Sequence, residues 1–454
     1  MRTLASECAK KIGEKVALYG WVNTRRSHGK ITFIDLRDRS GLIQIVFNEE
    51  STKLNNEDIV KIEGIVKKRP AQMVNSKIPT GAIEIEGKKY AILSKSKSLP
   101  FPLDNDGYDI QEELRLKYRY LDLRRPRLQR NIKIRSKYVQ SVREFLFASD
   151  FVEIETPLLT KSTPEGSRDF VVPSRINPGK FYALPQSPQQ YKQLLMTAGF
   201  ERYFQIARCL RDEDPRADRG FEHTQVDIEM SFVTKEEVMA LVEEMTIYAA
   251  EKIGAKIVKK PFPVISCQEA MKKYGADKFD LRTDKEKNEN ILSFAWVTDF
   301  PFFEKDKEGK WTFTHNPFSA PLFDHEKWHL NKTNIAQIVT QQYDLVCNGY
   351  EVGGGSIRTN KPEILKSTFE IMGYKEKEIE EKFGHMLEAF KFGTPPHGGC
   401  AQGFERLLMA YLGEEYLREV QAFPQSGSGK TSVMDAPSKL DSGLLKELSL
   451  TVSA

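Results

Sequence analysis

Three separated stretches of this sequence combine charged side chains with glycine or proline in a way that suits phosphate chemistry. They are FVEIETPLLTKSTPEGSRDF at 151–170, a segment rich in Arg and Asp at 201–232, and GCAQGFERLLMAYLG at 399–413. Arg211 and Arg406 lie in the second and third of them. Arginine binds phosphate through two parallel hydrogen bonds and keeps its charge, which suits it to phosphate chemistry, although each stretch taken alone could be an ordinary structural element. Because a lone surface arginine is more often part of a solvated salt bridge, the elements around them must be considered.

The N-terminal part of the chain predicts a small β-barrel. Residues 16–95 contain about five short runs with alternating apolar residues, β-branched and aromatic enrichment and glycine breaks. Five such strands suit a barrel of the OB type, although a β-sandwich module fits the same pattern. We assign residues 1–105 to this domain. A sharp change to prolines and then dense charge assigns residues 106–130 to a hinge.

The remainder, residues 131–454, predicts an α+β domain. Amphipathic segments such as KIRSKYVQSVREFLFAS alternate with short apolar segments such as RYFQIARCL, which favours an antiparallel sheet flanked by helices. The GSGKT sequence at 427–431 is similar to a phosphate loop, but that signature requires glycine where Pro424 stands. We interpret it as a surface loop.

Composition sets further limits. A chain of 454 residues is too long for one core, so two or three domains are expected. The five cysteines form no CxxC pair, which argues against a zinc site and a disulfide framework. No long apolar run and no signal-peptide pattern is present, so we expect a cytoplasmic protein without a membrane partner. The net charge of +4 is compatible with an RNA partner but does not establish one.

In their order and spacing, the three stretches resemble motifs 1, 2 and 3 of the class II aminoacyl-tRNA synthetases. The resemblance is strongest to the aspartyl-tRNA synthetases, and LKYRYLDLRRP, TPEGSRDF, FYALPQSPQQYKQLLM, NGYEVGGGS and GTPPHGG carry it along nearly the whole chain. It implies an OB anticodon-binding domain and a catalytic domain that activates L-aspartate with ATP and esterifies it to tRNA(Asp). Bacterial relatives insert an extra domain between motifs 2 and 3, and we expect a compact form that lacks it.

The resemblance also implies an ATP site with magnesium. Arg211 matches the α-phosphate arginine, which is shared with the aspartate site, and Arg406 matches the γ-phosphate arginine. Asp344 and Glu351 match carboxylates that hold Mg²⁺ between the phosphates, a role suited to hard oxygen ligands. The other ATP-binding residues implied are Glu213, Gly403, Phe404 and Glu405.

Two positions depart from the family pattern. His223 stands where a phenylalanine usually stacks on adenine, and an imidazole can also stack, so we keep it as an ATP contact. Gly220 replaces a glutamine that contacts ATP, so that contact must be absent or supplied by another residue.

For the amino acid, the resemblance implies a pocket that recognises a second carboxylate. Arg358 matches the side-chain clamp and Lys192 is the second positive group, which favours aspartate over asparagine or lysine. Glu165 is placed for the α-ammonium group. The other residues that would close over the substrate are Ser187, Gln189 and His315.

In the first domain, the resemblance implies that Phe33 stacks on an anticodon base and that Gln44 hydrogen-bonds one. Arg26 and Glu84 match further anticodon contacts. His28, in a predicted loop at 21–30, falls where relaxed relatives carry histidine and strict ones tend to carry leucine. This predicts that tRNA(Asn) is charged as well, the alternative being that His28 is an exposed loop residue without a role.

We expect a homodimer that pairs through the first motif, because synthetases of this class do so. Two alternative hypotheses about the function remain. A catalytically idle RNA-binding relative would lose an ATP arginine or a magnesium carboxylate, and the chain keeps all four. A synthetase-like enzyme that makes asparagine would lack the N-terminal barrel.

Overall fold

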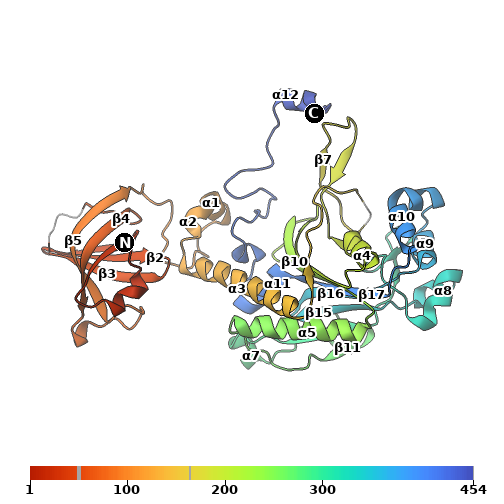
Figure 1. The fold of residues 1–454 in the computed structure, drawn as a ribbon, viewed down its shortest axis with the longest axis horizontal. Coiled ribbons are helices and arrows are strands. Elements are labelled where there is room, and N and C mark those ends of the chain that lie inside the picture. Colours follow the sequence, from red (N-terminus) through yellow and green to blue (C-terminus); the bar gives the residue numbers. More distant parts are fainter. Residues whose placement is uncertain (49–52, 163–164, 453–454) are drawn as a thin grey trace. The chain divides into compact units, whose positions relative to one another are not determined.

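The computed structural model describes residues 1–48, 53–162 and 165–452, and the chain divides into two compact units, Met1–Pro102 and Leu103–Ala454 (Figure 1). In the first unit, five strands close into a barrel in the order β1-β2-β3-β5-β4. This confirms the predicted five-stranded barrel. Its strands are β1 (Lys15–His28), β2 (Ile31–Asp38), β3 (Gly41–Phe47), β4 (Ile59–Lys68) and β5 (Ile83–Ser94), preceded by the 3-10 turn η1 (Ala5–Lys10), with η2 (Ala71–Met73) before β5.

Alternation along the strands builds the barrel core. In β2, Ile34 and Leu36 point inward and are buried, while Phe33 and Asp35, which alternate with them along the strand, are only partly covered on the outer surface. Every second residue of a strand faces the same side, so one face fills the barrel and the other remains available for a ligand.

The first hairpin differs from the expectation of a loop at 21–30. Residues up to His28 belong to β1 and pair with β2, ending at His28 opposite Ile31. Only two residues make the turn, and Gly29 adopts a positive φ of 58° there. A tight turn with a left-handed glycine lets the two strands stay paired up to the turn. The polar composition of residues 21–28 gave no sign that they belong to a strand.

The second unit is built on an eight-stranded sheet in the order β11-β12-β15-β16-β17-β10-β9-β6. The central pairs are antiparallel, and only the pairs β11–β12 and β6–β9 at its two ends are parallel. This confirms an antiparallel sheet with flanking helices. The strands are β6 (Val152–Glu153), β9 (Arg202–Leu210), β10 (Glu222–Ser231), β11 (Val264–Ser266), β12 (Phe294–Thr298), β15 (Gln342–Cys347), β16 (Tyr350–Arg358) and β17 (His397–Gly403).

Three helices cover one face of this sheet: α3 (Pro126–Ala148), α5 (Lys235–Lys252) and α11 (Phe404–Leu412) (Figure 1). In β10, Val226 and Ile228 join the apolar core under these helices, so Asp227 and Glu229 point to the opposite face. β15 repeats this arrangement, with Tyr343 in the core. The sheet therefore has one apolar face and one polar face.

The remaining elements surround the polar face or lie at the periphery. Helices α9 (Pro362–Ile371) and α10 (Glu376–Phe390) form a separate apolar cluster, and α10 contacts α4 (Gln189–Thr197). The others are α1 (Glu112–Lys117), α2 (Arg119–Asp122), α6 (Cys267–Tyr274), α7 (Asp284–Asn288), α8 (Glu326–Asn331), α12 (Ser442–Glu447), the hairpins β7 (Val171–Pro173) with β8 (Phe181–Ala183) and β13 (Phe303–Lys305) with β14 (Trp311–Phe313), and the 3-10 turns η3 (Phe323–His325), η4 (Ile335–Gln337) and η5 (Leu417–Val420).

The stretch 106–130, expected as a hinge, is part of the second unit. It forms α1, α2 and the start of α3, and several of its arginines are held in buried ion pairs. Arg119 lies 2.8 Å from Asp122, and Arg127 lies 2.7 Å from Glu419. The dense charge of this segment is therefore neutralised inside the fold, and the Arg127–Glu419 pair ties the segment to η5.

None of the helices in the described part of the chain has the length and apolar composition of a membrane span.

Candidate active site

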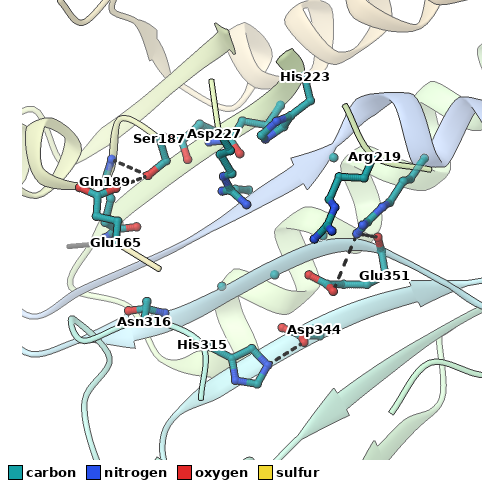
Figure 2. Close-up of a pocket in the computed structure, with 18 of the residues that line it drawn as sticks. Glu165, Ser187, Gln189, Arg219, His223, Asp227, His315, Asn316, Asp344 and Glu351 are labelled. Carbon is teal, nitrogen blue, oxygen red and sulfur yellow. Dashed lines mark hydrogen bonds and ion pairs between the residues drawn. The ribbon is translucent and has the colours of Figure 1, made fainter. Parts of the chain in front are cut away.

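A cleft of about 300 Å³ opens on the polar face of the sheet, between β10, β15, β16 and the start of α11 (Figure 2). Most of the residues predicted for the ATP, aspartate and metal sites line it although they are far apart in sequence. They are Glu165, Ser187, Gln189, Lys192, Arg211, Glu213, His223, His315, Asp344, Glu351, Arg358, Gly403, Glu405 and Arg406.

Phe404 does not line the cleft. Its side chain is completely buried in the core, 5.3 Å from the ring of Tyr138. β17 ends at Gly403, and the first residue of α11 points toward the helical side of the sheet. Its side chain therefore faces away from the cleft, and a contact of Phe404 with ATP stays a prediction for its backbone alone.

Two cations and two carboxylates form a buried cluster at the base of the cleft. Arg358 Nε lies 3.0 Å from Glu229 Oε1, and Lys192 Nζ lies 3.1 Å from Glu229 Oε2. Lys192 also contacts Asp227 Oδ1 at 2.7 Å. Ser356 Oγ accepts a hydrogen bond from Arg358 at 2.7 Å. The two cations are thus held in place before any substrate arrives.

The predicted side-chain clamp, Arg358 with Lys192, is thus paired with two acidic side chains of the protein itself. Burial raises the pKa of Asp227 against the opposing charge of Lys192. For Glu229, burial alone would raise the pKa, but Arg358 and Lys192 outweigh it and the pKa is lowered. Glu229 is the firmly charged partner, and Asp227 is the one that can give up its charge most easily when a further carboxylate enters.

Arg406 also lines the cleft and lies among acidic side chains. Its Nε is 3.1 Å from Asp218 Oδ2, and its Nη1 donates to the backbone oxygen of Glu351 at 3.3 Å. The Glu351 carboxylate in turn binds Lys278 Nζ at 2.8 Å. Arg406 lies in the first turn of α11, directly after β17, so the end of the strand sets its position.

The two predicted metal carboxylates lie on the neighbouring strands β15 and β16. Asp344 Oδ1 accepts from Gln342 Nε2 at 2.7 Å, and its Oδ2 lies 3.2 Å from His315 Nε2. The described residues contain no group of three or more His, Cys, Asp or Glu side chains that could hold a metal alone. Two carboxylates fit a Mg²⁺ ion that keeps waters and phosphate oxygens as its other ligands.

The segment between β9 and β10 carries Arg211 and Glu213. Arg211 Nε donates to the backbone oxygen of Gln186 at 3.3 Å. Glu213 is paired with Arg219 at 2.6 Å, and Ser167 also contacts it. Burial, followed by the charges of Arg211 and Arg406, lowers the pKa of His223 to about 3. Its imidazole is therefore neutral at physiological pH and can present its face to a base.

The side-chain amide of Gln425 lies beside Gly220. A Cβ added at Gly220 would lie 3.9 Å from Gln425 Oε1, which accepts a hydrogen bond from the amide of Phe221 at 3.1 Å. An amide side chain from a distant part of the chain thus stands beside the position where the family pattern has glutamine.

Glu165, Ser187 and Gln189 lie together at the rim of the cleft (Figure 2). Ser187 Oγ donates to Glu165 Oε2 at 3.0 Å, and the backbone N–H of Gln189 donates to Ser187 Oγ at 3.3 Å. The two residues before Glu165 in the TPEGSRDF segment, 163–164, lie outside the described residues.

Glycines in β16 leave the strand bare for two different reasons. At Gly355, an added Cβ would lie 2.0 Å from the backbone oxygen of Gly399, so close packing of β16 against β17 demands glycine. At Gly354, it would lie 2.9 Å from Asp344 Oδ1 and would crowd the carboxylate. Only the second supports the expectation that bare backbone leaves room for a ligand.

In the barrel, the predicted anticodon residues share the outer surface of β1, β2, β3 and β5. Arg26 of β1 lies directly opposite Phe33 of β2 in the strand register. Gln44 Nε2 donates to Glu84 Oε2 at 3.1 Å. The exposed His28 ring approaches Phe33 edge-on, with 6.1 Å between the ring centres. Phe33 lies outside the apolar core of the barrel.

A family model described as tRNA synthetases class II (D, K and N) matches residues 111–427, and the model of the OB-fold nucleic acid binding domain matches residues 16–93. The chain belongs to the class II tRNA synthetases. It is therefore an enzyme, an aminoacyl-tRNA ligase.

Curated relatives of this synthetase extend along nearly its whole length. An aspartate--tRNA(Asp/Asn) ligase of Caldanaerobacter subterraneus is 40% identical, covering 98% of this chain and 96% of the relative. One from Dictyoglomus turgidum is 39% identical, covering 98% and 96%. Both alignments span 574 positions against the 454 residues of this chain, so the relatives contain residues without counterpart here. This agrees with the expected compact form.

Solved structures share the fold of this class II synthetase. An asparaginyl-tRNA synthetase from Pyrococcus horikoshii has a TM-score of 0.75 at 23% identity, covering 94% of this chain and 98% of its own. An aspartyl-tRNA synthetase from Entamoeba histolytica has a TM-score of 0.73 at 22% identity, covering 93% and 91%.

Several residues of the synthetase site were missed by sequence reasoning. Asp227 and Glu229 stand in the apolar segment QVDIEM, and strict alternation of acidic with apolar residues there was the available signal. Lys278 and Gln425 gave no local signal, because only folding brings Lys278 to Glu351 and Gln425 to Gly220.

Proposed function

We propose that this class II synthetase is an aspartate–tRNA ligase. It activates L-aspartate with ATP to aspartyl-adenylate and then esterifies the amino acid to the 3′ end of tRNA(Asp) and also of tRNA(Asn). The buried pair of Arg358 with Glu229 at the base of the cleft carries the proposal, because it fixes a guanidinium where a second carboxylate can bind. The 37–40% identity to relatives named aspartate--tRNA(Asp/Asn) ligase supports it.

For the first step, the α-carboxylate of aspartate attacks the α-phosphate of ATP and pyrophosphate leaves. We assign Arg211 to the α-phosphate and Arg406 to the γ-phosphate, since both guanidinium groups face the cleft from different elements. Catalysis then consists of positioning and charge neutralisation, with little covalent work for the protein. Glu213, His223, Gly403 and Glu405 would surround the nucleoside end.

Magnesium would be held by Asp344 and Glu351 and would supply neutralisation of the phosphate charge. Glu351 is bound to Lys278 and Asp344 to His315, so each carboxylate is kept in place before nucleotide and metal arrive. Their assignment follows from the two-carboxylate chemistry that a phosphate-bound Mg²⁺ prefers.

For the amino acid, Arg358 and Lys192 would hold the side-chain carboxylate. Glu165, fixed by Ser187, would accept hydrogen bonds from the α-ammonium group. Gln189 and His315 lie at the rim of the same cleft and would complete the pocket.

The barrel would read the anticodon through Phe33 and Gln44, with Arg26 and Glu84 beside them. His28 stands next to Phe33 at the exposed end of β1, where it reaches any base stacked on that ring. A flat imidazole that can donate or accept a hydrogen bond is poorly suited to excluding one anticodon, which fits charging of both tRNA pools.

Aspartylation of purified tRNA(Asp) and tRNA(Asn), side by side, tests the proposal. Wild type should charge both, and His28→Leu should lower charging of tRNA(Asn) more than charging of tRNA(Asp). If wild type ignores tRNA(Asn), the dual specificity is wrong. If both proteins charge it equally, His28 is not the residue responsible.

We also infer that the enzyme is a cytoplasmic homodimer paired through α3 and the segment after it. Large apolar side chains remain exposed there, with Phe147 53%, Leu158 53% and Leu159 52% exposed. Sedimentation equilibrium should give a dimer for wild type and a weaker one for Phe147→Asp, whereas a monomeric wild type would contradict the inference.

A further inference from the structure

A chain of hydrogen bonds leads from helix α10 to Glu165. His385 Nε2 lies 2.7 Å from Gln190 Oε1, and Gln190 Nε2 donates to Glu165 Oε1 at 3.0 Å. The other carboxylate oxygen, Oε2, accepts from Ser187 Oγ at 3.0 Å. Both oxygens of Glu165 are therefore oriented by neighbouring side chains, and the outer end of one chain is a histidine that no motif contains.

The direction of these hydrogen bonds is fixed by their chemistry. A carboxylate only accepts, so Gln190 must turn its amide nitrogen to Glu165 and its oxygen to His385. His385 must then donate from Nε2. Burial, with the nearby charge of Lys161, lowers the pKa of His385, so the ring is neutral near pH 7 with its hydrogen on Nε2.

His385 and Gln190 are both held by helices that are fixed in the fold. α10 is anchored in an apolar cluster through Phe383 and Phe390, and the Lys161 ammonium contacts the backbone oxygen of Glu381 on the same helix. Gln190 lies in the first turn of α4 and is only 9% exposed. A cavity of about 390 Å³ borders Glu165, Gln190 and His385, so these polar groups line a space beside the main cleft rather than filling the core.

We propose that His385 is a positioning residue for the amino-acid substrate. Through Gln190 it holds the Glu165 carboxylate in the orientation that receives the α-ammonium group. The proposal rests on the proposed function, in which Glu165 binds that group. A loop carboxylate left without this support would sample other orientations, and the substrate would have to select the productive one.

Kinetics of amino-acid-dependent ATP–pyrophosphate exchange separate this role from a structural one. His385→Phe keeps a planar ring and removes the donor. It should raise the KM for aspartate roughly three- to tenfold, as expected for one lost hydrogen bond, and leave the KM for ATP and kcat within about twofold. His385→Gln retains an N–H donor and should restore the KM for aspartate to near the wild-type value. Glu388→Gln, one turn further along the same exposed face of α10 and without a contact to Gln190, serves as the matched control and should change nothing.

Two further variants make the result decisive. Gln190→Leu interrupts the same chain and should raise the KM for aspartate as His385→Phe does, and the double variant should be no worse than Gln190→Leu alone. Unchanged KM for aspartate in both single variants, or multiplicative effects in the double variant, would overturn the proposal, as would a parallel rise in the KM for ATP. Glu165→Gln separates a failure of the His385 proposal from a failure of the proposed function. If Glu165→Gln leaves the KM for aspartate unchanged, the assignment of Glu165 to the α-ammonium group is itself wrong.

Discussion

Arg358 on β16 and Glu229 on β10 face each other at 3.0 Å across the intervening strand β17, and both side chains are almost completely buried. Lys192 shares the second oxygen of Glu229, so the three residues form one electrostatic unit. Breaking a buried pair leaves an uncompensated charge, which costs far more than a surface pair is worth.

Arg358→Leu should therefore weaken aspartate activation by ~3 kcal/mol or more, because the substrate carboxylate loses its guanidinium partner and Glu229 is left with Lys192 alone. Pyrophosphate exchange as a function of aspartate concentration measures this, with thermal unfolding as a check on the fold. Arg358→Lys keeps the charge but not the two-pronged geometry of the guanidinium, so its aspartate activation should lie between that of wild type and that of Arg358→Leu. An undiminished Arg358→Leu enzyme would disprove the clamp.

The two arginines assigned to ATP give a second prediction. Arg406→Ala and Arg211→Ala should each lower adenylate formation by ~10²-fold or more, since each removes a fixed positive charge from the phosphate chain. Binding of tRNA should stay almost intact. Arg208→Ala, which removes a half-exposed arginine paired with Glu222, is the control and should retain activity. If tRNA binding falls equally, the two arginines maintain the fold instead.

A pair of phenylalanines in the barrel distinguishes binding from packing. Phe33→Ala should cost ~1–3 kcal/mol of anticodon stem-loop binding through lost stacking, without lowering the unfolding midpoint. Phe47, 6% exposed in the barrel core, should behave oppositely, because Phe47→Ala leaves a cavity. Loss of the barrel fold on Phe33→Ala would show that Phe33 is a core residue.

Acid should destabilise the second unit through buried histidines. Burial lowers the pKa of His329 to about 4, and its Nδ1 has no hydrogen-bond partner among the described residues. Because the unfolded imidazole titrates near ~6.5, falling pH protonates the unfolded state first, and stability is lost between about pH 6.5 and about pH 4. Urea unfolding at about pH 7 and about pH 5.5 should show His329→Gln losing ~1 kcal/mol less than wild type. Equal losses would contradict this.

The sequence was most informative where chemistry and pattern coincide. The alternation in β2 predicted a barrel strand, and the motifs around Arg211 and Arg406 predicted residues that the fold brings to one cleft. It was least informative about orientation and pairing. Phe404 lies in the third motif but its side chain points into the core. The dense charge around Arg119 was interpreted as a hinge, although it is neutralised inside the fold.

Contacts between distant elements were beyond reach of local patterns. His385 meets Gln190 only because α10 packs against α4, and no spacing in the sequence encodes that contact. The same holds for Gln425 beside Gly220. Such residues can be found only after the fold has placed them.

The central claim, activation of aspartate in this cleft, is tested most directly by ATP–pyrophosphate exchange with the purified protein and single amino acids. Exchange should require aspartate and should be hardly detectable with asparagine or lysine, because the buried guanidinium of Arg358 is matched to a carboxylate. Comparable exchange with asparagine or lysine, or none with aspartate, would contradict the account.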